Sequence, residues 1–75
     1  MPRGATTRSN GRQLRVGQRV IYRVGKNRFR AVIVEDRGNI GIDGERIFLL
    51  RALEDGPAAA GETFELAAEE LKPIR

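Results

Sequence analysis

The sequence has no cysteine, histidine or tryptophan, and its aromatic residues are one tyrosine and three phenylalanines. Without cysteine and histidine the chain has no disulfide, no thiol nucleophile, no imidazole base, and no zinc or haem site built from those residues. The only serine, Ser9, has no histidine to activate it. We therefore expect a protein that is not an enzyme and that uses no cofactor or metal.

Long apolar runs are also missing. No stretch approaches the roughly 18 apolar residues that a membrane-spanning helix requires. The start, Met1 to Gly4, lacks the apolar region of a signal peptide. A chain of 75 residues indicates one domain with a small core. We expect a cytoplasmic protein that does not contact membranes.

Charge is distributed unevenly along the chain. Residues 1–34 contain nine basic and no acidic side chains, whereas residues 35–75 contain five basic and ten acidic ones. The net charge of +4 is therefore the sum of +9 and −5. Residues 16–75 carry ten charges of each sign, so the positive excess lies in the first 15 residues. This polarity indicates an anionic partner for the first half.

Turn-forming residues divide the chain into an arm and several short strands. Residues 1–13 offer almost nothing to bury and predict a flexible, disordered basic arm, while residues 14–75 predict the folded domain. Alternation over residues 19–24 predicts a strand with Val20, Tyr22 and Val24 on one face. Its other face would present Arg19, Ile21 and Arg23.

Two further strands follow in the β-branched run 28–36 and the apolar stretch 45–53. The turn Gly25-Lys26-Asn27 separates the first two strands, and Asp43-Gly44 predicts a type I′ hairpin turn. Residues 62–72 fit either a strand followed by a short helical turn or one longer helix, because both alternation and helical spacing are present.

Three segments resemble the SH3-like small barrels, a group that includes KOW and Tudor modules. Val16-Gly17-Gln18-Arg19-Val20 is similar to the entry of their first strand, and the run 30–34 to their second. The segment 64–74 is similar to their closing strand, one-turn 3₁₀ helix and last short strand. The KOW signature has glycine where Ala31 stands. The resemblance implies an all-β, five-stranded SH3-like barrel with a short 3₁₀ or α turn near the C-terminus.

One SH3-like family is enzymatic, the small plasmid-encoded dihydrofolate reductases. Their pore is lined by a Val-Gln-Ile-Tyr run, whereas this chain has Thr63-Phe64-Glu65-Leu66 at the matching place. The polar and aromatic groups that hold cofactor and folate in that family are missing here. This departure agrees with the expectation of a protein without enzyme activity.

The basic half predicts a surface that binds nucleic-acid phosphates, RNA or DNA, through a positive ridge and the arm. The predicted binding residues are Arg15, Arg19, Arg23, Lys26, Arg28 and Arg30, with Tyr22 as a stacking residue. Two alternatives stay open. The arginines could instead pair with Glu35, Asp36, Glu45 and Glu65 across the barrel. The domain could also be an adaptor barrel that docks an acidic or extended peptide of a protein partner, or that self-associates through a strand edge. It would then be a monomer or a weak homo-oligomer.

Overall fold

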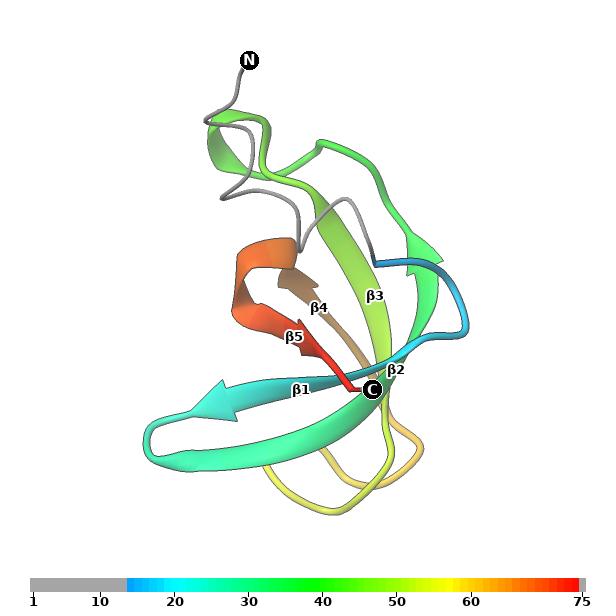
Figure 1. Ribbon diagram of the computed structural model, residues 1–75, viewed down its shortest axis with the longest axis vertical. Coiled ribbons are helices and arrows are strands. Elements are labelled where there is room, and N and C mark those ends of the chain that lie inside the picture. Colours follow the sequence, from blue (N-terminus) through cyan, green and yellow to red (C-terminus); the bar gives the residue numbers. More distant parts are fainter. Residues whose placement is uncertain (1–13, 75) are drawn as a thin grey trace.

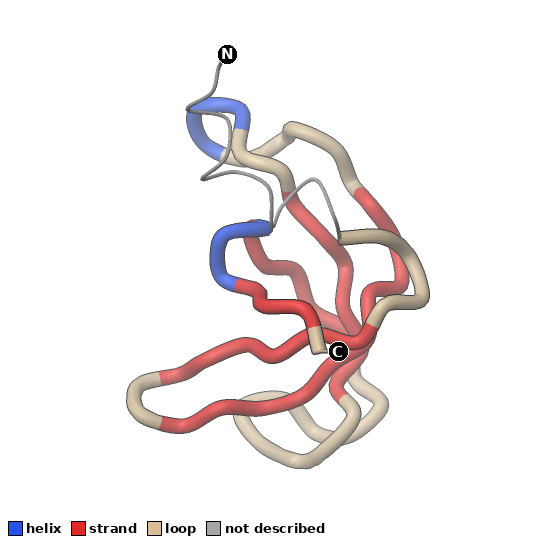
Figure 2. The backbone as a smooth tube through the Cα atoms, in the orientation of Figure 1, coloured by secondary structure: helices blue, strands red, loops and turns tan. Residues whose placement is uncertain are grey.

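The computed structural model describes residues 14–74 and shows one antiparallel sheet with the strand order β4-β3-β2-β1-β5 (Figures 1 and 2). The described chain consists of β1 (Arg19–Val24), β2 (Asn27–Asp36), η2 (Ile42–Gly44), β3 (Ile47–Ala52), β4 (Thr63–Ala67), η3 (Ala68–Glu70) and β5 (Leu71–Pro73). This architecture confirms the predicted all-β class with five strands and a 3₁₀ turn near the C-terminus. The predicted arm, residues 1–13, lies outside the described residues.

The ambiguous C-terminal segment forms a strand, a single turn and a second strand. β4 pairs with β3, and η3 then redirects the chain so that β5 pairs with β1. The backbone N–H of Ala68 donates to the carbonyl of Arg46 at 2.8 Å, which ties the start of η3 to the segment before β3. Strand pairing buries Leu71 beside Tyr22, a contact between distant parts of the chain that local helix propensity does not include.

The core lies on the inner face of this curved sheet. Its buried residues are Leu14, Val20, Tyr22, Ala31, Ile33, Phe48, Leu50, Ala68 and Leu71. Val24 shares the predicted face with Val20 and Tyr22 but lies outside the core. Val24 is 47% exposed, because the end of β1 extends beyond its pairing with β5.

Two tight turns need positive φ angles. Gly25 has φ +61 as the first central residue of the two-residue loop between β1 and β2, and Lys26 keeps a negative φ, which defines a type II′ turn. Asp43 and Gly44 have φ values of 60 and 76, and the N–H of Glu45 donates to the carbonyl of Ile42 at 3.2 Å. The predicted type I′ turn is therefore confirmed.

A β-bulge divides β2 into two parts. Ile33 lies opposite Leu50, but Glu35 lies opposite the next residue, Leu49, so Val34 is an extra residue in the strand. In a regular strand, residues 33 and 35 would share a face. The bulge instead places Glu35 on the outer face with Leu49 while Ile33 stays in the core. A carboxylate that would otherwise point into the core is thereby solvated.

The loop between β3 and β4 packs against the β1–β2 hairpin, where Gly56 of the loop lies beside Phe29 of β2. A Cβ added to Gly56 would lie 2.6 Å from Cδ1 of Phe29, so only glycine lets this loop approach the ring so closely. The same ring packs on Tyr22, with 5.6 Å between centroids. Phe29 is thus held between the loop and the core.

We predict that Gly56→Ala destabilises the fold by about 1–3 kcal/mol, because the added methyl overpacks the space beside Phe29. Urea denaturation monitored by circular dichroism measures this cost. In a Phe29→Leu background the smaller side chain relieves the overlap, so Gly56→Ala should cost less there. An equal cost in both backgrounds would contradict the proposed contact.

Candidate functional site

The outer face of β1 and β2 gathers basic side chains in cross-strand pairs. Arg23 lies opposite Arg28, and Ile21 lies opposite Arg30. Because directly opposed residues in an antiparallel pair point to the same side of the sheet, these arginines share one surface. Val20 and Tyr22 point to the other side, into the core. Four of the predicted binding residues, Arg19, Arg23, Arg28 and Arg30, are thus brought together on the outer face.

Two further cations join this surface from strands later in the chain. Lys72 in β5 lies opposite Ile21, and Arg51 in β3 lies opposite Val32. Sequence reasoning missed both, because only the pairing register brings them beside β1 and β2. We call the six exposed residues Arg19, Arg23, Arg28, Arg30, Arg51 and Lys72 the cationic face. Lys26 stands at the adjoining hairpin turn.

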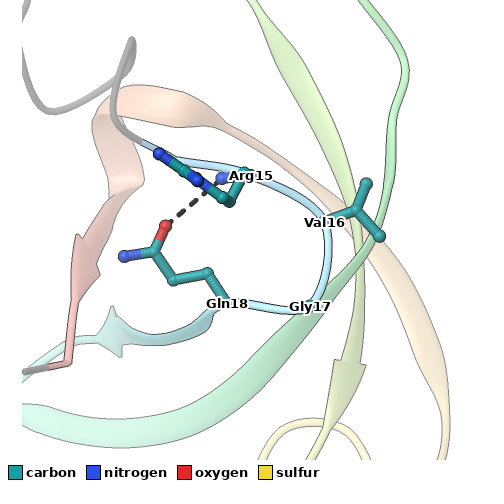
Figure 3. A pocket seen from close by; sticks show the side chains of 4 residues that line it. All are labelled: Arg15, Val16, Gly17 and Gln18. Atoms are coloured by element: carbon teal, nitrogen blue, oxygen red, sulfur yellow. Dashed lines mark hydrogen bonds between the residues drawn. The ribbon is translucent and has the colours of Figure 1, made fainter.

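Arg15 precedes β1 in a turn. Its backbone N–H donates to Oε1 of Gln18 at 3.2 Å (Figure 3). The backbone N–H of Gln18 donates to the carbonyl of Arg15 at 3.1 Å. Arg15, Val16, Gly17 and Gln18 line a shallow hollow here of about 450 Å³. Arg15 therefore lies outside the cross-strand rows of the cationic face.

Tyr22 does not belong to a binding surface, and its assignment as a stacking residue is corrected. The side chain is 2% exposed and contacts the rings of Phe29 and Phe64. Its hydroxyl has no hydrogen-bond partner among residues 14–74. Burial is the main cause that raises the pKa of this hydroxyl, and the nearby charge of Glu54 raises it further. A ring in the core cannot stack on a base.

Two arginines of the acidic half, Arg37 and Arg46, form ion pairs with acids of that half. Arg37 bonds Glu35 at 3.2 Å and Glu65 at 2.8 Å, two carboxylates that flank Leu49 on the outer face. Asp36 binds Nη2 of Arg46 at 2.6 Å, and the Arg46 guanidinium lies 5.0 Å from the ring centroid of Phe48. Three of the four acids that could have paired with the positive ridge, Glu35, Asp36 and Glu65, are therefore bound to Arg37 or Arg46 instead.

The cationic face has few such partners. Within residues 14–74, Arg30 is its only member with an ion pair, at 3.4 Å from Glu54. Glu54 also accepts the backbone N–H of Arg30 at 2.7 Å, the largest cause that lowers the pKa of this carboxyl. Arg19, Arg23, Arg28, Arg51 and Lys72 form no ion pair with any described residue.

A groove of about 340 Å³ crosses one end of this surface. It is lined by Ile21, Arg23, Arg28 and Lys72 from the strands and by Glu69 and Glu70 from η3. Glu45, the fourth expected acidic partner, shares a hydrogen bond with the Glu69 carboxyl, and this is the main cause that raises its pKa. The Glu45 carboxyl therefore interacts with other acids rather than with the cationic face.

Comparisons with known protein families, curated proteins and solved structures find no match, so the resemblance to SH3-like barrels stays a prediction. Within residues 14–74 no group of His, Cys, Asp and Glu side chains is arranged to hold a metal ion. No helix in this part of the chain is long and apolar enough to cross a membrane.

The two carboxyls with opposite pKa shifts predict opposite responses to pH. The pKa of Asp36 is lowered mainly by its hydrogen bond to Arg46, so its contribution to stability is present above its ordinary value of 3.8 and is lost as the pH falls. The pKa of Glu45 is raised above its ordinary value of 4.5, so its ionisation destabilises the fold increasingly as the pH rises from that value through the folded pKa.

We therefore expect Asp36→Asn to destabilise the domain at pH 7, by up to about 1 kcal/mol for so exposed a pair. Glu45→Gln should stabilise it at the same pH. Both differences from the parent protein should shrink as the pH falls below about 4, where carboxyls protonate in the folded and unfolded chains. Urea denaturation at pH 7 and at acidic pH measures them, and shifts of the same sign would contradict the assignment.

Proposed function

We propose that this protein is a non-enzymatic module that binds the phosphate backbone of nucleic acid through the cationic face. The observation that carries the proposal is the scarcity of ion pairs on this face, while Glu35, Asp36 and Glu65 are bound by Arg37 and Arg46. Side chains already paired with acids would have to break those contacts before binding a phosphate. Arg19, Arg23 and Arg28 have no such contact to break within the described residues.

The composition of the face also supports phosphate as its ligand. Five of its six members are arginines, whose planar guanidinium groups match phosphate oxygens in bidentate pairs. Half-buried Ile21 and Val32 lie among these basic residues on the same face of the sheet. The charged groups of this face therefore project from hydrogen-bonded strands of the sheet.

Neutralising about five phosphates releases condensed counterions, so affinity for duplex DNA should fall with a log–log salt slope of about −4.5. Arg23→Gln and Arg28→Gln should each weaken binding and reduce the size of this slope by about one. Fluorescence anisotropy with labelled oligonucleotides at several salt concentrations measures both effects.

The matched control is Arg37→Gln, which removes the same charge from a residue bound to Glu35 and Glu65. It should leave both the affinity and the slope almost unchanged. Equal weakening by Arg23→Gln and Arg37→Gln would show that net charge, not the cationic face, determines binding. Absence of binding at low salt would remove the proposed function.

One observation favours self-association as a second candidate function. Ile40 and Ile42, in the connection between β2 and β3, are 65% and 83% exposed. Two large apolar side chains that are two residues apart and exposed form a small apolar surface, which a second copy of the chain can cover.

If this surface pairs two copies, sedimentation equilibrium should show a mass that rises between micromolar and millimolar concentration. The Ile40→Ser/Ile42→Ser variant should stay monomeric over the same range. Val16→Ser is the control, because it removes another exposed apolar side chain away from this connection. A parent protein that is monomeric throughout would exclude the second candidate.

A further inference from the structure

The end of the β1–β2 hairpin projects from the sheet as a two-stranded ribbon. β5 pairs with β1 only over Val20–Tyr22, and β3 pairs with β2 only from Ala31 onward. The two pairs next to the hairpin turn, Arg23 with Arg28 and Val24 with Asn27, have no third strand beside them. Figure 1 shows this hairpin extending past the other strands. We call residues 23–28 the ribbon.

The ribbon carries only positive charge. Arg23, Lys26 and Arg28 are its charged residues, and the nearest acid before or after it in sequence is Glu35. All three are exposed, and none forms an ion pair with a described residue. Val24 at the tip is also 47% exposed. The acids nearest to the ribbon in space that line a groove with it are Glu69 and Glu70 of η3, and neither forms an ion pair with Arg23 or Arg28.

Packing below the ribbon holds it in place. Phe29 immediately follows it and is wedged between Tyr22 and Gly56. Glu54 binds both the backbone N–H and Nε of Arg30. The type II′ turn at Gly25 has the twist that suits a tight hairpin. Because the ribbon is ordered before binding, little conformational entropy is lost when it docks.

No aromatic ring is available to stack on bases. All four aromatic residues, Tyr22, Phe29, Phe48 and Phe64, belong to the core or pack against it. Proteins that hold single-stranded nucleic acid combine a basic groove with exposed rings on which successive bases stack. The cationic face supplies the charge but not the rings, so it gains little from unpaired bases.

We propose that the ribbon enters the major groove of duplex DNA while the rest of the cationic face contacts the flanking phosphates; this inference rests on the proposed function. The major groove of B-DNA is about 12 Å wide and admits a two-stranded β-ribbon. The strands of such a ribbon lie about 4.8 Å apart, which leaves room for side chains at the groove walls. The major groove of A-form RNA is deep and too narrow for side chains to read.

The first experiment compares three ligands of one length and sequence: duplex DNA, duplex RNA and single-stranded DNA. Fluorescence anisotropy at one moderate salt concentration should show duplex DNA bound at least about tenfold more tightly than either of the others, a difference of about 1.4 kcal/mol. Equal or tighter binding to duplex RNA or single strands would overturn the duplex inference and leave the proposed function standing. No binding to any ligand at low salt would remove both.

The second experiment separates the ribbon from the rest of the cationic face. Lys26→Ala removes the charge at the ribbon tip, and Arg51→Ala removes one from β3, away from the tip. Lys26→Ala should reduce the preference for duplex DNA, whereas Arg51→Ala should weaken all three ligands alike. Thermal unfolding of each variant checks that the fold is retained. Equal loss of duplex preference in both variants would overturn the role of the ribbon.

A third measurement tests the groove itself. Netropsin occupies the minor groove of A·T-rich DNA, so a duplex saturated with it should still bind the protein. Displacement of the protein by netropsin, with no change on a G·C-rich control duplex, would place the contact in the minor groove and overturn the proposal.

Discussion

The bulge at Val34 is the constraint on which the two surfaces of this domain depend. β2 is the strand shared by both parts of the sheet, since its first half pairs with β1 and its second half with β3. One extra residue keeps Ile33 in the core and turns Glu35 outward, where Arg37 binds it. Without that shift a carboxylate would be buried without a partner, at a cost of several kcal/mol.

The separation of charge follows from this arrangement. Residues 16–75 are neutral as a whole, yet Glu35, Asp36 and Glu65 form ion pairs with arginines of their own half. Arg37 and Arg46 bind Glu35, Glu65 and Asp36, so those acids are engaged beside β3 and β4. The basic residues of β1 and β2 are left with Glu54 as their single ion-pair partner within residues 14–74. A neutral domain thereby acquires a surface suited to an anion.

Local patterns in the sequence predicted much of the fold. Alternation marked β1, β-branched residues marked β2, and Asp43-Gly44 predicted a turn whose two positive φ angles are present. Alternation predicted the two faces of β1 but not where the core ends, so Tyr22 was assigned to a binding surface although its side chain is buried. Burial depends on the strands that lie beside β1 rather than on β1 itself.

By itself, the sequence determined the strand periods, the turn chemistry, the lack of imidazole and thiol groups, and the one-sided charge of residues 1–34. These are properties of single residues and their near neighbours. Only the tertiary structure decided that Lys72 and Arg51 join Arg23 and Arg28, and which carboxylate each arginine meets. The physical reason is that strand register and a single bulge decide which face a side chain occupies, and a shift of one residue reverses it.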